Sequence, residues 1–318
     1  MIPMRNADVI YFDYNATTPC DPRVVEAMLP FMTERFANPT TRNHRPGRDA
    51  ASALESARAK VDRMLGGRAA SEVVFTASAT EANNLALIGA TEALMTQSRH
   101  IISQATEHAS VLEPLAALKR RGWEITLVGV DNEGSVRLDE FETAFGRETA
   151  LVSLMLANNE TGTIQPVAEA SELARSRGAI VHCDAAQGVG KIPVDVRDLG
   201  VDLLTLSAHK LYGPKGVGAL WVRHKRPGIR LTPVLFGGGQ ESGLRSGTPN
   251  VPGAVGLARA IEITAKEGDR ERERVGALRD RLETMILETI DGTAVNGRRD
   301  LRLPNTTNIS IADLEINS

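Results

Sequence analysis

The middle of the chain alternates short apolar runs with stretches of helical periodicity that end in glycine. The apolar runs lack a clean polar–apolar alternation, which is typical of strands buried on both faces of a parallel sheet. The pattern therefore predicts an α/β fold with three α/β/α layers around a mainly parallel central sheet. The expected strands lie within residues 72–78, 100–108, 149–158, 179–187, 202–210 and 216–224.

Helices are expected on either side of this core in the sequence. Residues 21–36 and 48–65 read as two helices, and Asp21 suits the N-cap of the first. Residues 253–290 read as one long helix or two. Within them, residues 269–274 mix both charge signs, which indicates a solvated helical face.

The last stretch, "AVNGRRDLRLPNTTNISIADLEINS", predicts a β-rich unit in which "NTTNISI" is a strand and "DLEINS" begins a helix. A lone strand and one helical turn cannot bury a core, so this smaller α+β domain is expected to be truncated in its C-terminal part. We assign residues 15–260 to a large cofactor-binding domain, and residues 1–14 and 261–318 to the small domain.

Charge and composition indicate which classes of binding partner the protein can have. The 318 residues include 37 basic and 40 acidic side chains, a net charge of −3, without the basic patch that nucleic acid or an anionic membrane would need. No leader-like or membrane-spanning run is present, which favours a cytoplasmic protein with a small-molecule partner. Cys20 and Cys183 suit neither a disulfide framework nor a zinc site, and no metal is expected.

Lys210 is the strongest candidate for covalent chemistry. Ser207, His209 and Lys210 fall at the carboxyl end of an expected strand, where parallel α/β sheets bind ligands. A lysine there can form a Schiff base with a carbonyl, most often that of pyridoxal phosphate. Lys215 belongs to the following turn and is the weaker candidate.

Other strand ends offer what that cofactor needs. Asp184 can keep the pyridine nitrogen protonated, and the alternative is that it simply caps the next segment. The helix start at Ala79 and Thr80 offers N–H groups and a hydroxyl to a phosphate. His108 can stack on the ring, although a histidine satisfied as a cap or in the core is the alternative, and Asn159 is a neutral donor for a phenolate or carboxylate oxygen.

Eight stretches together resemble the NifS/IscS-type cysteine desulfurases, pyridoxal-phosphate enzymes of fold type I in the aminotransferase class V group. They cover almost the whole chain in the family's order, and the last is more similar to the NifS/IscS branch than to the SufS-like branch. The stretches are "YFDYNATTP", "FANPTTRNHRPG", "VVFTASATEANNLAL", "ATEHASVLEP", "NNETGTIQPV", "VHCDAAQGVGKIPVDV", "SAHKLYGPKGVGALWVR" and "GGGQESGLRSGTPNV".

The resemblance implies roles for particular residues. Lys210 matches the lysine that binds the cofactor covalently, and His108 matches the histidine stacked on its ring. Asp184 matches the partner of the pyridine nitrogen, and Gln187 matches the side chain that reaches the ring hydroxyl.

Further matches concern the phosphate and the second subunit. The phosphate cup is matched by Ala79, Thr80, Ser207 and His209, and Asn159 matches an asparagine near the ring hydroxyl and the substrate. Thr248 matches a threonine that reaches the phosphate of the other subunit, so the resemblance implies a homodimer.

The implied reaction converts L-cysteine to L-alanine and passes the sulfur through a protein thiol to a sulfur-acceptor or iron–sulfur scaffold protein. The family's nucleophilic cysteine lies beyond the stretch that matches "NTTNISI" and has no counterpart in these 318 residues. We expect neither Cys20 nor Cys183 to replace it, and we favour a fragment of a longer protein over a short form that works with a complementing polypeptide. Two other functions stay open: another class V lyase or aminotransferase, and a catalytically silent dimer that binds a sulfur-acceptor protein.

Overall fold

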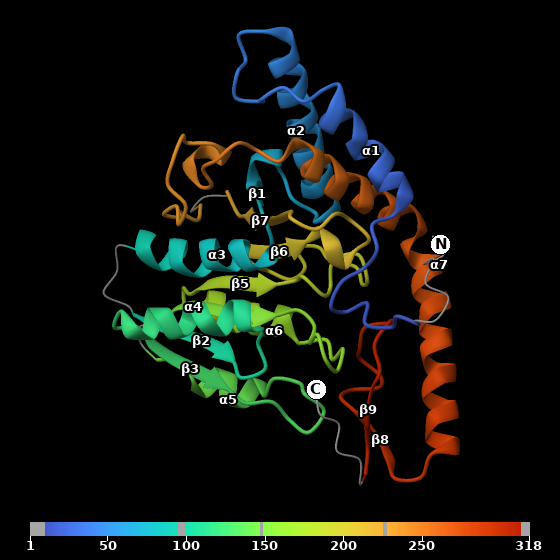
Figure 1. Cartoon of the computed structure of the whole chain (residues 1–318). Helices are drawn as coiled ribbons and strands as arrows, with labels where there is room; N and C mark the ends of the chain where they lie inside the picture. Colours follow the sequence, from blue (N-terminus) through green and yellow to red (C-terminus); the bar gives the residue numbers. More distant parts are fainter. Residues whose placement is uncertain (1–9, 95–98, 147–148, 225–227, 313–318) are drawn as a thin grey trace.

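A seven-stranded sheet forms the centre of the computed structural model, which describes residues 10–94, 99–146, 149–224 and 228–312 (Figure 1). The strand order is β1-β7-β6-β5-β4-β2-β3. Neighbours from β3 to β6 run parallel, whereas β7 runs antiparallel to both β6 and β1. The bounds are β1 Val73–Thr76, β2 His100–Gln104, β3 Glu124–Val128, β4 Thr149–Met155, β5 Ile180–Asp184, β6 Leu203–Ser207 and β7 Gly218–Val222.

The predicted α/β class and mainly parallel sheet are thus confirmed, with two additions. β7 can run antiparallel because residues 208–217, which contain no crossover α-helix, join it to β6. β3 was not expected, since it lies at the sheet edge with most of its side chains partly or fully exposed and lacks the apolar run of a central strand.

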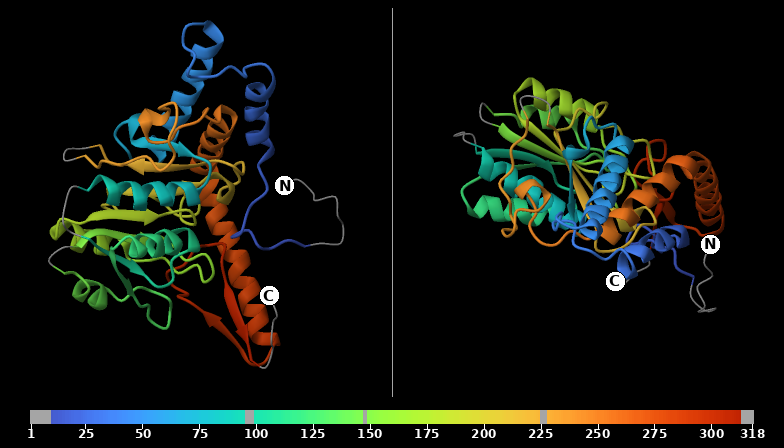
Figure 2. Two further views of the ribbon diagram at one scale, coloured as in Figure 1. Left: turned by 60° about the vertical axis from the view of Figure 1, so that its left-hand side comes forward. Right: turned by 90° about the horizontal axis from the view of Figure 1, so that it is seen from above.

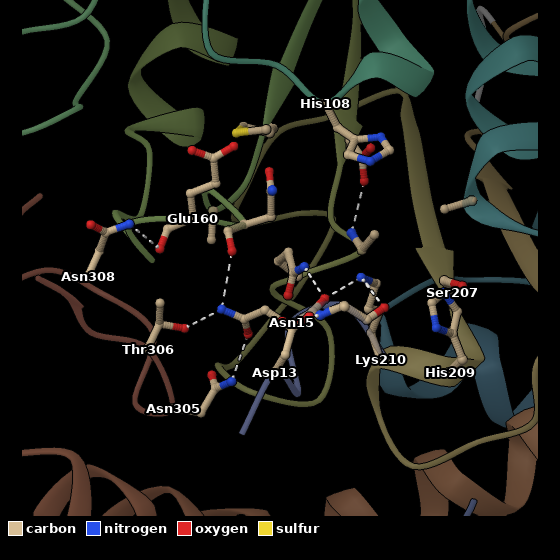
Figure 3. A pocket seen from close by; sticks show the side chains of 18 of the residues that line it. Asp13, Asn15, His108, Glu160, Ser207, His209, Lys210, Asn305, Thr306 and Asn308 are labelled. Carbon is tan, nitrogen blue, oxygen red and sulfur yellow. Dashed lines mark hydrogen bonds between the residues drawn. The ribbon is translucent and has the colours of Figure 1, made fainter. Parts of the chain in front are cut away.

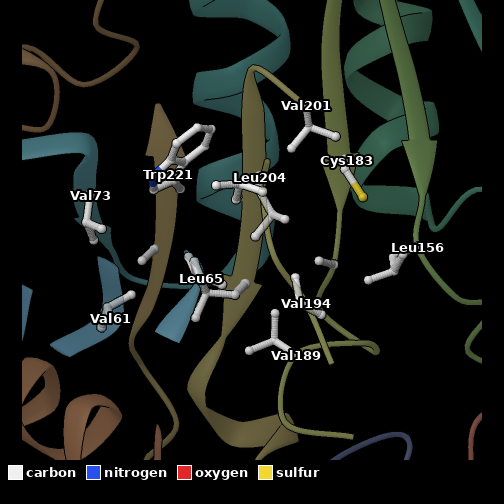
Figure 4. Packing of buried hydrophobic residues seen from close by; sticks show 14 of the residues in the cluster. Val61, Leu65, Val73, Leu156, Cys183, Val189, Val194, Val201, Leu204 and Trp221 are labelled. Carbon is white, nitrogen blue, oxygen red and sulfur yellow. The ribbon is translucent and has the colours of Figure 1, made fainter. Parts of the chain in front are cut away.

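Helices cover both faces of the sheet (Figures 1 and 2). The strand pleat divides the core accordingly: Leu203 packs with one face and the adjacent Leu204 with the other. One face carries α3 (Ala79–Ala93) and α4 (Ala109–Arg120). The other face, shown in Figure 4, packs against α1 (Pro22–Thr33), α2 (Arg45–Met64), α5 (Leu138–Thr143), α6 (Val167–Ser176) and the first turns of α7 (Val251–Thr289).

The first two helices begin where local chemistry satisfies their free N–H groups. Asp21 caps α1 as predicted, because its carboxylate accepts from the backbone N–H of Arg23 at 2.8 Å. α2 starts three residues before the expected position, since Nδ1 of His44 accepts from the N–H of Gly47 at 3.0 Å. None of the described helices is long and apolar enough to cross a bilayer.

α7 is one continuous helix that links the core to the C-terminal segment. Its far half packs beside the antiparallel hairpin of β8 (Thr293–Asn296) and β9 (Asn308–Ile311). The buried Arg302 side chain pairs with Glu283 of α7 at 2.7 Å and thereby fixes the segment between the two strands. The helix runs through the domain boundary predicted at residue 260, which stays a prediction, and the helix predicted in "DLEINS" lies outside the described residues.

A buried ion pair anchors the loop between β7 and α7. The Glu241 carboxylate accepts two bonds from the Arg58 guanidinium, at 2.6 and 2.8 Å, and one from the N–H of Phe75 at 2.8 Å. Both charged side chains are less than a tenth exposed. This pair holds Glu241 and Ser242 in the left-handed backbone region, with φ of 48° and 56°, which costs about 1 kcal/mol or more per residue.

Replacing Glu241 by alanine is expected to lower the free energy of unfolding by roughly 3–5 kcal/mol, because the buried Arg58 guanidinium would lose its two bonds to this carboxylate and keep only the Val73 carbonyl and a 3.5 Å contact with the exposed Glu55. Urea denaturation followed by circular dichroism measures the loss. Glu267→Ala is the matched control, since it removes only the half-exposed pair with Arg23 and should cost much less. Equal losses in the two variants would contradict the prediction.

Candidate functional site

A cavity of about 1210 Å³ opens at the carboxyl ends of the parallel strands (Figure 3). It is also lined by the N-terminal turns of α3 and α4, the segment around Asn15, the stretch before β9 and the part of α7 from Val275 to Leu282. Nine of the ten residues predicted for the site line it: Ala79, Thr80, His108, Asn159, Asp184, Gln187, Ser207, His209 and Lys210.

Lys210 lies in a short 3₁₀ turn (η2, Ala208–Lys210) directly after β6. Its Nζ donates to the main-chain carbonyls of Asn15 and Ala16, the latter at 2.9 Å. Burial lowers the pKa of this amine, and the charges of Asp13 and Asp184 offset only part of that effect. A larger share of the amine is therefore neutral, as a nucleophile requires.

Asp184 ends β5 with its carboxylate buried below the cavity. Oδ2 accepts from Nδ2 of Asn83 on α3 at 2.7 Å, and Oδ1 accepts from the N–H of Ala186 at 3.0 Å. Burial raises its pKa, while these two donors and the nearby charges of His108 and Lys210 favour the anion. The carboxylate is thus placed to pair with a cationic ring nitrogen.

His108 caps α4 and is joined to Asp184 through a short chain of hydrogen bonds. Its Nδ1 accepts from the N–H of Ser110 at 3.1 Å and lies 2.8 Å from the Ser110 hydroxyl. That hydroxyl accepts from Nδ2 of Asn83 at 2.9 Å. Because Nδ1 acts as an acceptor, the proton of a neutral imidazole resides on Nε2. The cap and the site roles weighed as alternatives for His108 are therefore compatible.

Glu107 is a second buried carboxyl group beside this network. Oε1 accepts from the N–H of Met155 at 2.5 Å, and Oε2 has no partner among the described residues. Burial and the nearby Asp184 raise its pKa well above 4.5. Burial thus favours the neutral form of Glu107, whereas the two donors to Asp184 favour the anion there.

The cavity end beside α3 offers donors to an anion. The free N–H groups of the first turn of α3, which starts at Ala79, lie next to Thr80 and Ser207, and the buried Ser207 hydroxyl has no partner among the described residues. β7 passes so close that a Cβ on Gly218 would come within 2.7 Å of the Ser78 carbonyl carbon. Only glycine allows this approach.

Asn15 ties the opposite wall together, and sequence reasoning missed it. Its Nδ2 donates to the carbonyl of Asn159 at 3.2 Å and to the Thr306 hydroxyl at 2.9 Å (Figure 3). Its Oδ1 accepts from Nδ2 of Asn305 at 2.9 Å. Asn15 lies within the motif "YNATTP", but nothing local shows that residues nearly 300 positions away meet it.

Thr248 is the one predicted site residue that does not line the cavity. It is exposed on the loop that Glu241 anchors. The same loop reaches the site helix through Arg245, whose guanidinium pairs with Glu81 of α3 at 2.8 Å, and through the N–H of Thr232, which donates to the Gly89 carbonyl of α3 at 2.9 Å.

Comparison with known proteins places this geometry in a family. The aminotransferase class-V family matches residues 10–318. The chain is 46% identical over 306 residues to "Cysteine desulfurase IscS" of Anaeromyxobacter dehalogenans, covering 96% of this chain and 75% of that protein. The chain belongs to the aminotransferase class-V family. It is also 47% identical over 305 residues to "Cysteine desulfurase IscS 1" of Archaeoglobus fulgidus, covering 96% of this chain and 78% of that protein.

Solved structures agree with this class V assignment. A NifS-like protein superposes with a TM-score of 0.91 at 41% identity, over 96% of this chain and 82% of that one. A structure described as SspA in complex with cysteine superposes with a TM-score of 0.84 at 36% identity, over 95% of this chain and 84% of that one.

Class V enzymes use pyridoxal 5′-phosphate, and the cavity of this chain fits that group. The amine of Lys210 and the buried carboxylate of Asp184 line the same space. The unpartnered Ser207 hydroxyl and the helix start at Ala79, with no side chain at Gly218, suit a phosphate. Lys210 thus suits the aldehyde of the cofactor, Asp184 suits its ring nitrogen, and the Ser207 end of the cavity suits its phosphate.

Glu107→Gln is expected to weaken the pH dependence of stability. A carboxyl with a raised pKa in the fold loses stabilisation as pH rises above 4.5 towards that raised value, whereas glutamine cannot ionise. Chemical denaturation at about pH 5 and about pH 8 should show a larger loss in the wild type than in the variant. The exposed Glu113→Gln is the control, and an unchanged pH dependence in Glu107→Gln would show that Glu107 is ionised in the fold.

Proposed function

We propose that the protein is a pyridoxal-phosphate-dependent cysteine desulfurase that converts L-cysteine to L-alanine and transfers the sulfur to a thiol. The observation that carries the proposal is the meeting of Lys210, His108 and Asp184 in one cavity beside the unpartnered Ser207 hydroxyl. The names of the curated relatives and the cysteine complex of a similar structure support the choice of substrate.

When bound, the cofactor supplies an electron sink for bond breaking next to the amino group of the substrate. Lys210 would bind the aldehyde carbon, and its lowered pKa favours the neutral amine that this bond needs. Asp184 would hold the ring nitrogen in its protonated form. Gln187 and Asn159 would face the ring hydroxyl and the substrate, as both line the cavity.

His108 would stack on the ring and move protons through Nε2. The bond from the Ser110 N–H keeps Nδ1 occupied, so only Nε2 is left for the cavity. The Ser110–Asn83 connection joins the orientation of this ring to the Asp184 carboxylate. Phosphate would be held by Ser207, His209, Thr80 and the N–H groups that begin α3.

We further propose that the sulfur acceptor is a thiol other than the two cysteines of this sequence. Cys183 is fully buried on the sheet face opposite Asp184, among apolar side chains (Figure 4), and burial raises its pKa well above 9.0. Burial and Asp21 also raise the pKa of Cys20, against a smaller effect of Lys215. In the balanced reaction, cysteine and the acceptor thiol RSH give alanine and the persulfide RSSH.

A homodimer belongs to the same proposal. Thr248 is exposed and outside its own cavity, so it would reach the phosphate site of a second copy. α1 presents the exposed apolar residues Val25, Leu29 and Met32 at helical spacing, and Phe236 is exposed on the loop that carries Thr248. We propose a cytoplasmic location and an iron–sulfur scaffold or other sulfur-acceptor protein as partner, which the IscS name of the relatives supports.

Lys210→Ala is expected to abolish the visible absorption of the lysine-bound cofactor and the formation of alanine from cysteine. The reaction is assayed with pyridoxal 5′-phosphate and excess small thiol as acceptor, and alanine is measured by mass spectrometry. Lys215→Ala is the matched control, because its exposed side chain makes only a 3.4 Å contact with the Thr18 carbonyl. A keto acid as product, or no alanine from the wild-type chain, would overturn the proposed reaction.

A further inference from the structure

The turns after β5 bring a second lysine behind the cavity wall. The N–H of Gly188 donates to the Ala185 carbonyl and that of Lys191 to the Gly188 carbonyl, both at 3.0 Å. These consecutive turns place the side chains of Gln187 and Lys191, four positions apart, side by side. Gln187 lines the cavity, whereas Lys191 does not and is mostly buried behind it.

Lys191 fixes which way the neighbouring side-chain amides face. Its Nζ donates to Oε1 of Gln187 at 2.5 Å and to Oδ1 of Asn15 at 3.0 Å. The Lys191 amine has at least two N–H donors whether it is charged or neutral, and these match the two amide oxygens that face it. The NH₂ group of Gln187 then faces the Asn15 main-chain carbonyl at 3.0 Å, with one hydrogen left to donate.

The same contact orients Asn15, which joins the two sides of the cavity mouth. With Oδ1 towards Lys191, its NH₂ group faces the Asn159 carbonyl and the Thr306 hydroxyl. The main-chain carbonyl of Asn15 accepts from Lys210 as well as Gln187. One buried amine thus sets the polarity of the network around the lysine that binds the cofactor.

An ion pair does not account for this lysine. Among the described residues, its amine contacts the two amide oxygens and no carboxylate. Burial and the charge of Lys210 lower the pKa of Lys191 to about 7. A methionine of similar length would fill the same volume without that desolvation cost, so the donors to Gln187 and Asn15 are what lysine adds.

We propose that Lys191 is a positioning residue that holds the Gln187 amide with its NH₂ group presented to the ring hydroxyl of the cofactor. The inference rests on the proposed function for the identity of the cofactor. It does not require the sulfur-transfer step, because orientation of Gln187 acts on cofactor binding itself.

A double-mutant cycle on cofactor affinity tests the proposal. The dissociation constant for pyridoxal 5′-phosphate is measured by equilibrium dialysis, without cysteine, for the wild type, Lys191→Met, Gln187→Leu and the double variant. Lys191→Met should weaken binding about threefold to tenfold, the value of one hydrogen bond. The loss in the double variant should be clearly smaller than the sum of the two single losses, because Lys191 acts mainly through Gln187.

Two further variants separate positioning from a general structural role. Lys191→Arg keeps the donors and should retain affinity within about threefold. Lys60→Met removes a half-exposed lysine of α2 that pairs with Glu262 of α7 and should leave the affinity unchanged. Urea denaturation of each variant checks the fold, and Lys191→Gln, which should weaken binding less than Lys191→Met, replaces that variant if the latter does not fold.

Additive losses in the double variant, or unchanged affinity in a folded Lys191→Met, would overturn the proposal. These results are independent of alanine formation. A chain that binds the cofactor with the expected coupling and yields no alanine contradicts the desulfurase function and leaves the role of Lys191 standing. A chain that yields alanine but shows no coupling between Lys191 and Gln187 supports the desulfurase function and contradicts the role of Lys191.

Discussion

Burial of the Asp184 carboxylate is the constraint around which the site is arranged. A buried anion must be met by donors, and these come from Asn83 on α3 and the N–H of Ala186. The same Asn83 amide supports Ser110, which in turn orients His108. Burial favours the neutral form of Glu107 beside it. The hydrogen bonds that compensate the Asp184 charge therefore fix α3, α4 and the His108 imidazole relative to β5.

Elements of the fold could be predicted where burial or a local contact requires a particular type of residue in the sequence. Central strands show continuous apolar runs, and Asp21 marks the start of α1 because the cap is a local interaction. β3 leaves a weak signal because an edge strand needs fewer apolar residues. The direction of β7 and the unbroken course of α7 depend on connections and packing, which the pattern of single residues does not record.

The candidate site followed from strand ends, because parallel strands bring their carboxyl ends to one edge. Lys210, Asp184 and His108 were predictable on that ground. Residues that support these side chains from outside the cavity were not predictable. Asn83 is a polar residue within the apolar helix α3, and its hydrogen-bond partners are on β5 and α4. Asn15 meets segments nearly 300 residues away. Such roles arise from tertiary contacts alone.

The continuity of α7 has a mechanical consequence. Its 39 residues make a rod of about 58 Å, with the first turns packed in the core and the far half paired through Glu283 with Arg302. The stretch after Arg302 lines the cavity through Asn305 and Thr306. Because α7 is a single rigid helix, a tilt of a few degrees at its first turns would move the cavity residues Asn305 and Thr306 at its far half by a few ångströms. The width of the cavity mouth is thereby coupled to the packing of the first turns of α7 in the core.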